Sequence, residues 1–147
     1  MAEGETALPP ATDRASYRIW TYDKLRYGDT DRQGHVNNAV YSTFFETGRV
    51  AFLYDKDLAL AAPGCEFVVA RLVIDFHAEL FFPGNVDIGT RVLRVGRSSF
   101  TVGQGVFMAD LCAATAEIVA VQMNTETRRA ATLSPAMTDW LGERLAG

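Results

Sequence analysis

The sequence predicts an α+β fold in which one long helix packs against an antiparallel sheet. Apolar and polar residues alternate over residues 66–80, which is the period of a strand with one buried face. Before that segment, residues 38–57 carry phenylalanines and other apolar residues at helical spacing. The strands expected after residue 66 have short connections, and short connections join antiparallel neighbours. Because these strands cannot cover their own apolar face, the helix is expected to cover it.

The first half of the chain is expected to form a strand and then the long helix. Residues 16–28 are rich in aromatic and β-forming side chains, which predicts the first strand. The helix is expected over residues 38–57, with Asn37 or Asn38 as its N-cap. Gly48 lies inside this helix, where a missing side chain would let another part of the chain approach closely.

The second half is expected to supply the rest of the sheet and a short helix. In the strand over residues 66–80, the even-numbered residues from Val68 to Leu80 are apolar and are expected to face the core. Ser134 and Pro135 predict the N-cap and first residue of a terminal helix. Turn residues separate three further expected strands, at residues 85–95, 98–111 and 115–129.

Length and composition indicate a single globular domain over residues 16–147, preceded by a disordered leader at residues 1–15. The net charge is −4 and the arginines are scattered, which argues against a nucleic-acid partner. No stretch approaches the ~18 consecutive apolar residues of a membrane span. The two cysteines form no paired motif and the N-terminus lacks a signal-peptide pattern, so a cytoplasmic location is expected.

The segment "DTDRQGHVNN", residues 29–38, concentrates polar side chains just before the expected helix. A helix N-terminus offers unpaired N–H groups, so the amide of Asn38 could polarise a substrate carbonyl and stabilise an oxyanion. Asp31 could attack that carbonyl or activate a water, and Gly34 would allow a tight turn between the two. The spacing therefore suits acyl transfer to water without a metal or an organic cofactor.

A purely structural role explains the same residues. Aspartate, asparagine and glycine are the residues that turns and helix caps use. From composition alone, the segment could be a polar loop that only starts the helix.

Family resemblance favours an active site. Residues 27–49, "YGDTDRQGHVNNAVYSTFFETGR", resemble the active-site segment of hotdog-fold thioesterases of the 4-hydroxybenzoyl-CoA thioesterase type, which carry a "GDxDxxG" run before a long central helix. The "HVNN" portion is similar to plant acyl-ACP thioesterases. Residues 70–102, with the turn "GRSSF", resemble the strands that follow in the family, and the likeness covers about residues 16–129.

The resemblance assigns roles to positions of this chain. It implies that Asp31 is the nucleophile or general base and that the Asn38 amide is the oxyanion donor. His35 matches the histidine of the acyl-ACP branch, although that branch has asparagine where this chain has Gln33, and the benzoyl-CoA branch usually lacks a histidine here. Together with Asn37, His35 is expected to orient the thioester or water. Asp29 is expected to be a structural residue that binds the backbone of its own turn.

Further positions are expected to contact the substrate. Arg97 resembles the family's turn near the CoA nucleotide, and a permanently charged guanidinium suits phosphate, but an ordinary hairpin turn explains it equally well. Glu46 could be a helical catalytic carboxylate as in a second thioesterase branch, or it could form an ion pair with Arg49. The substrate-binding residues expected are Gly34, Tyr41, Arg97, Ser98 and Ser99.

The resemblance implies a homodimer or homotetramer that hydrolyses acyl-CoA, or acyl carrier protein thioesters, at sites between protomers. No metal is expected, because His77 with Asp75 and Glu79 reads as a polar strand face rather than a set of converging ligands. Two other functions fit the fold. One is hydration of enoyl thioesters, although three residues separate Asp31 from His35 and no "NP" pair lies between them. The other is non-catalytic acyl-CoA binding.

Overall fold

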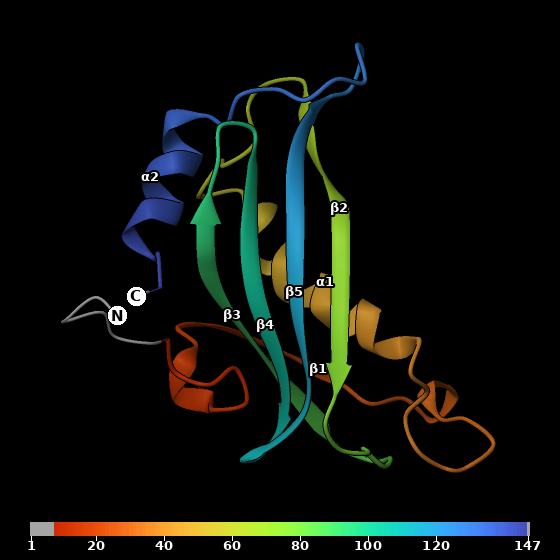
Figure 1. Ribbon diagram of the computed structural model, residues 1–147. Coiled ribbons are helices and arrows are strands. Elements are labelled where there is room, and N and C mark those ends of the chain that lie inside the picture. The colour runs from red at the N-terminus through yellow and green to blue at the C-terminus, as the bar shows by residue number, and fades with distance from the viewer. Residues whose placement is uncertain (1–7, 147) are drawn as a thin grey trace.

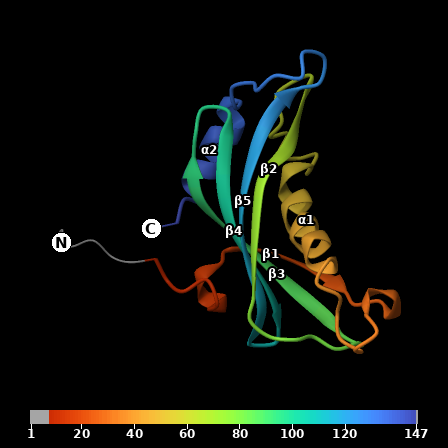
Figure 2. The same ribbon diagram turned by 45° about the vertical axis from the view of Figure 1, so that its right-hand side comes forward.

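The computed structural model describes residues 8–146, and in this part of the chain the α+β prediction is confirmed. Five antiparallel strands form one sheet in the order β1-β3-β4-β5-β2. The long helix α1 lies on one face and the N-terminal segment lies on the other, whereas α2 lies beside β3 with Trp140 stacked on Phe52 of α1 at 4.9 Å (Figures 1 and 2). The main elements are β1 (Ile19–Lys24), α1 (Val40–Leu53), β2 (Cys65–Phe76), β3 (Asn85–Val95), β4 (Ser99–Met108), β5 (Leu111–Asn124) and α2 (Pro135–Glu143).

The core lies between α1 and the strands β1, β3 and β4. Phe44, Phe45 and Phe52 of α1 are each at most 3% exposed. Each buried phenylalanine contributes roughly 1.5–3 kcal/mol to stability. Gly48 confirms the expected close approach: a Cβ there would lie 2.6 Å from both Nε2 of Gln104 and a side-chain carbon of Ile88. The helix therefore touches the sheet through its own backbone.

The start and end of α1 differ from the prediction. The N-cap is Ala39, which makes no side-chain capping bond, whereas Asn37 and Asn38 precede the helix. Asn37 instead accepts the N–H of Ala39 at 3.0 Å and closes a turn just before the helix. The helix ends at Leu53 rather than residue 57, because the Asp55 carboxylate accepts the N–H groups of residues 57 and 58 and forms a turn there.

The expectation that β2 buries its even-numbered face is wrong for a single chain. Val68, Leu72 and Phe76 are 36%, 38% and 49% exposed. β2 is one of the two edge strands and pairs only with β5, while α1 packs chiefly on β1, β3 and β4. A register shift between Val69 and Arg71 also breaks the strict alternation. One chain therefore leaves an apolar strand uncovered at the edge of its sheet.

Part of the expected disordered leader is folded onto the sheet. The hydroxyl of Tyr17 donates to the Ala11 carbonyl at 2.6 Å, and that of Ser16 donates to the Pro10 carbonyl at 2.6 Å. Tyr17 packs on β3 and β4, against Gly89 and Gly105, where no side chain intervenes. The boundary expected at residue 16 was therefore too late; residues 1–7 lie outside the described part.

The C-terminal prediction is confirmed. α2 begins at Pro135, and the Ser134 hydroxyl accepts the N–H of Met137 at 3.1 Å. Met137 and Leu141 are fully buried in the same core cluster as the phenylalanines of α1, and this burial fixes α2 in place. Among residues 8–146, neither helix has the length and hydropathy that a membrane span requires.

Candidate active site

The segment 29–38 forms a compact loop fastened to the sheet, at the lower right of Figure 1. The N–H of Asp31 donates to the His35 carbonyl at 2.9 Å, and the N–H of Gly34 donates to the Asp31 carbonyl at 3.0 Å. Gly34 has a φ of +88°, which confirms that this turn needs the freedom of glycine. The N–H of Val36 then donates to the Leu80 carbonyl at 2.8 Å, and this bond ties the loop to the segment after β2.

Inside this loop the Asp31 carboxylate lies beside the His35 ring. Oδ2 of Asp31 is 3.3 Å from Nδ1 of His35, while Oδ1 accepts the N–H of Gln33 at 2.8 Å. Nε2 of His35 lies 2.9 Å from the side-chain oxygen of Gln33. The hydrogen-bond partner of Nδ1 is the Val36 carbonyl at 3.5 Å, so Asp31 acts on the ring as a neighbouring charge. The loop therefore places a carboxylate next to a histidine, two groups that can take part in acid–base chemistry.

A pocket of about 400 Å³ opens beside this pair. His35, Asn38 and Tyr41 contribute to its wall, whereas Asp31 stands behind His35 and does not line it. The backbone N–H of Asn38 has no acceptor among residues 8–146, which leaves this donor available to a ligand. Tyr41 is 2% exposed, and its ring packs edge-on against Phe76 at 5.2 Å. The remaining lining residues are Gln33, Val36, Phe76, His77, Ala78 and Glu79.

Asp29 has the structural role that was expected. Its carboxylate accepts the N–H of Arg26 at 2.8 Å, and its carbonyl accepts the N–H of Asn37 at 2.8 Å. Both bonds hold the loop that carries Asp31. Asp29 itself is absent from the pocket wall.

Sequence reasoning missed two residues of the pocket. His77 is fixed by a hydrogen bond of 2.8 Å between its Nε2 and the Thr115 hydroxyl. Glu79 brings a second carboxylate within 3.8 Å of Nε2 of His35. The sequence did indicate that His77 and Glu79 share one face of the expected strand. It did not indicate that this face lies next to the loop at residues 29–38. Within the described chain, no three His, Cys, Asp or Glu side chains converge as metal ligands.

The turn between β3 and β4 lies far from this pocket within one chain. Arg97, Ser98 and Ser99 are at the opposite end of the sheet from the loop at residues 29–38 (Figure 1). Arg97 donates from Nε to the Thr132 hydroxyl at 3.4 Å, and the Ser98 carbonyl accepts the N–H of Gln122. A single protomer therefore does not bring these three of the five expected substrate-binding residues to Asp31 and Asn38.

Glu46 does not form the expected ion pair with Arg49 within the described residues. Arg49 is buried and donates to the side-chain oxygen of Gln104 at 3.3 Å. Burial lowers the pKa of Arg49, and the charge of Glu46 acts in the opposite direction. Glu46 is exposed and lies outside the wall of the pocket beside His35.

Two buried tyrosines make the stability of the protein sensitive to alkaline pH. Burial raises the pKa of Tyr41 to about 12, and the Glu79 carboxylate adds to the rise. Burial likewise raises the pKa of Tyr17 to about 12, partly opposed by Arg91. An unfolded tyrosine ionises near ~10. The unfolded state therefore loses protons first, and the free energy of unfolding should fall as the pH rises from about 10 to about 12.

Urea unfolding at several pH values tests this sensitivity. Tyr17→Phe and Tyr41→Phe should each make the alkaline fall shallower, because each removes one phenol whose pKa differs between the two states. Tyr22→Phe, at a 69% exposed position, is the control and should leave the fall unchanged. Identical pH profiles for the wild type and both buried variants would contradict the assignment.

Comparison with known proteins agrees with this architecture. The family model described as the thioesterase-like superfamily matches residues 25–141. A curated protein of Aquifex aeolicus named "Putative esterase" is 26% identical over 96 residues, which cover 63% of this chain and 75% of that protein. A solved structure from Pseudomonas aeruginosa is 25% identical, covers 92% of this chain and 96% of its own, and superposes with a TM-score of 0.81.

A second solved structure carries a description of activity. It is named "Probable Thioesterase", comes from Bartonella henselae, and is 28% identical, covering 78% of this chain and 96% of its own with a TM-score of 0.69. The family match spans most of the chain and includes the whole loop at residues 29–38, α1 and all strands after it. The chain therefore belongs to the thioesterase-like superfamily, whose general activity is the hydrolysis of thioester bonds.

Proposed function

We propose that this protein hydrolyses acyl-CoA thioesters to a free carboxylic acid and CoA. The observation that carries the proposal is that Asn38, whose backbone N–H has no acceptor among residues 8–146, lines the same pocket as His35, with the Asp31 carboxylate 3.3 Å from the His35 ring. One group can stabilise an oxyanion and the other can move a proton. These are the two requirements of acyl transfer to water.

In the proposed reaction the thioester carbonyl oxygen accepts the N–H of Asn38. Asp31, directly or through His35, removes a proton from water as the water oxygen bonds to the carbonyl carbon. The resulting oxyanion then expels the CoA sulfur, which takes up the proton and leaves as a thiol. Asn37 contributes by holding the N–H of Ala39 in its own turn, which fixes the backbone beside Asn38. Direct attack by Asp31 on the carbonyl is the other route, through an anhydride that water then opens.

A thiol-detecting assay on a panel of acyl-CoA and acyl carrier protein thioesters tests the activity. Release of CoA thiol with aliphatic or aromatic acyl groups is the expected result. Loss of the enoyl-CoA chromophore without thiol release would identify a hydratase instead. Tight acyl-CoA binding without any turnover across the panel would identify a binding protein.

The uncovered strand β2 supports a homodimer as part of this proposal. Val68, Val69, Leu72, Val73 and Phe76 of β2 are all more than a third exposed. An exposed apolar edge strand has unpaired backbone groups that a second copy can pair. Pairing two chains along β2 would cover this strand. It would also give each pocket residues from a partner, which is how Arg97 and its neighbours could reach a substrate.

A lysine on the edge strand tests the dimer. Val69→Lys, at a position 44% exposed on β2, should shift the protein toward the monomer, because a desolvated lysine opposes strand pairing. Light scattering after size-exclusion chromatography reads the mass. Leu111→Lys is the matched control, since Leu111 is 50% exposed at the start of β5, away from the free edge of β2. The interface would be contradicted if Val69→Lys and Leu111→Lys lowered the measured mass equally, or if neither variant changed it.

A further inference from the structure

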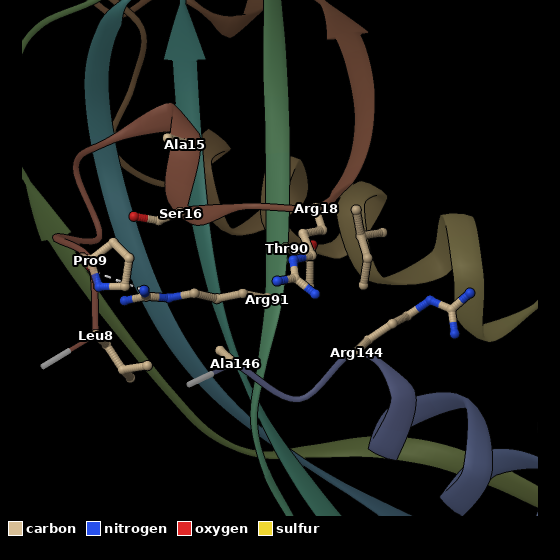
Figure 3. A pocket seen from close by; sticks show the side chains of 10 residues that line it. Leu8, Pro9, Ala15, Ser16, Arg18, Thr90, Arg91, Arg144 and Ala146 are labelled. Atoms are coloured by element: carbon tan, nitrogen blue, oxygen red, sulfur yellow. Dashed lines mark hydrogen bonds between the residues drawn. The ribbon is translucent and has the colours of Figure 1, made fainter. Parts of the chain in front are cut away.

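A second pocket, of about 260 Å³, lies beside β3, where the first and the last of the described residues meet (Figure 3). Its walls come from the N-terminal segment, the start of β1, the middle of β3 and the residues after α2. The pocket is therefore separate from the one beside His35, with which it shares no lining residue.

The charged residues of this pocket are all arginines. Arg18, Arg91 and Arg144 line it, and no aspartate or glutamate among residues 8–146 does, although the chain as a whole carries a net charge of −4. Arg144 is partly engaged elsewhere: its guanidinium stacks on Trp140 at 4.1 Å and lies 3.6 Å from Glu143. In Figure 3 the guanidinium of Arg144 points away from Arg91. Arg18 and Arg91 are thus the cations that a ligand would meet.

These two arginines are neighbours at the end of a strand pair. β1 and β3 are antiparallel with Ile19 opposite Thr90, so the next position along places Arg18 opposite Arg91. In Figure 3 the Arg91 guanidinium extends toward Pro9 and the Arg18 guanidinium lies near Thr90, so the two charged groups point to different parts of the pocket. Within residues 8–146, neither guanidinium has a carboxylate within 4.0 Å. Both guanidinium groups are therefore positive charges that an anion in the pocket could neutralise.

Arg91 also has unused hydrogen-bonding capacity. It donates from Nη1 to the Pro9 carbonyl at 2.9 Å, but its Nε is buried without an acceptor in the described chain. The side chain lies flat on β4, where a Cβ on Gly103 would be 3.4 Å from that Nε. It also passes under the Tyr17 ring, at 5.7 Å. These contacts hold the guanidinium in place at the pocket before any ligand arrives.

We propose that this pocket binds a small amphipathic anion, a carboxylate or phosphate head on a short apolar tail. The forked guanidinium groups of Arg18 and Arg91 match the oxygens of either head group. Leu8, Pro9 and Ile19 give the remaining wall an apolar character suited to a short tail. The volume is just below the usual range of ~300–1,000 Å³ for small-molecule pockets, which limits the tail to a few carbons.

Isothermal titration of the full-length protein with hexanoate, hexyl phosphate and hexanol tests the proposal. At least one of the two anions should bind at one site per chain, and neutral hexanol should bind at least tenfold more weakly. Arg18→Gln and Arg91→Gln should each weaken the anion tenfold or more. Arg94→Gln is the matched control, because it removes the same charge from an exposed position on the same strand and should change the affinity less than twofold.

Arg18→Gln keeps the test decisive if Arg91→Gln destabilises the fold, because Arg18 is exposed and makes no hydrogen bond or ion pair within the described residues. The comparison of hexanoate with hexyl phosphate identifies the preferred head group. The proposal would be overturned if neither anion bound, or if hexanol bound as tightly as the anions. It would also be overturned if Arg94→Gln weakened anion binding as much as Arg18→Gln and Arg91→Gln do. The readout is binding alone, so the result does not depend on thioester hydrolysis.

Discussion

Replacing Asp31 by asparagine should lower kcat for thioester hydrolysis by about 10²–10⁴-fold, the usual contribution of a positioned base. An asparagine keeps an oxygen that can accept the N–H of Gln33, so the turn should persist. It cannot take a proton, attack a carbonyl or stabilise a protonated His35. The measurement is the steady-state rate of thiol release, with circular dichroism to confirm the fold.

Asp29→Asn is the matched control for this variant. It makes the same substitution two residues earlier, and Asp29 is bonded to the N–H of Arg26 and absent from the pocket wall. We expect its kcat to stay within about threefold of the wild type, because its amide oxygen can accept the same bond. A wild-type kcat for Asp31→Asn on every hydrolysed thioester would remove Asp31 from the mechanism.

His35→Ala separates the two ways in which Asp31 could act. If Asp31 works through His35, removing the ring should cost as much as Asp31→Asn, because the two form one unit. If Asp31 contacts water or the carbonyl directly, His35→Ala should cost clearly less. We expect the first result, because His35 lines the pocket and Asp31 does not. Asp31 lies 3.3 Å from the His35 ring, close enough to act through it.

The parts of the fold that depend on local sequence could be predicted, and those that depend on distant partners could not. Ser134 and Pro135 start α2 as expected, because capping involves only residues within one turn. The period-two pattern of β2 correctly predicted a strand but assigned its apolar face to the core. That face is open, because β2 lies at the edge of the sheet, and sheet order is not encoded in the periodicity of one strand.

The candidate site likewise has parts that could be predicted from local sequence and parts that could not. The loop at residues 29–38 is a local structure, so its glycine turn and the proximity of Asp31 and His35 follow from their spacing. His77 and Glu79 reach the pocket only because the chain returns past the loop after β2, as the bond from Val36 to Leu80 shows. Arg97 could be placed on a turn, but the sequence did not reveal that this turn lies at the other end of the sheet.

Gly48→Ala should destabilise the protein by about 2–4 kcal/mol, although alanine is the better helix former. The new Cβ would lie 2.6 Å from Nε2 of Gln104 and from Ile88, so helix and sheet must separate or repack. Overpacking of this kind costs roughly 1–3 kcal/mol. Gln104 is fully buried, and its Nε2 donates to the Phe45 carbonyl and the Thr90 hydroxyl at 3.0 Å each. Displacing it would leave buried groups unpaired, at a further ~1–3 kcal/mol.

Gly142→Ala is the control that isolates this effect. Gly142 is also within a helix, but a Cβ there meets no atom within 4 Å. Only helix propensity then differs, so the free energy of unfolding of this variant should rise by up to ~1 kcal/mol. Urea unfolding of both variants should therefore give opposite signs for the same substitution. Two stabilised variants would mean that α1 does not touch the sheet at Gly48. Two variants of opposite sign would show that the absence of one methyl group sets the distance between α1 and the strands beneath it.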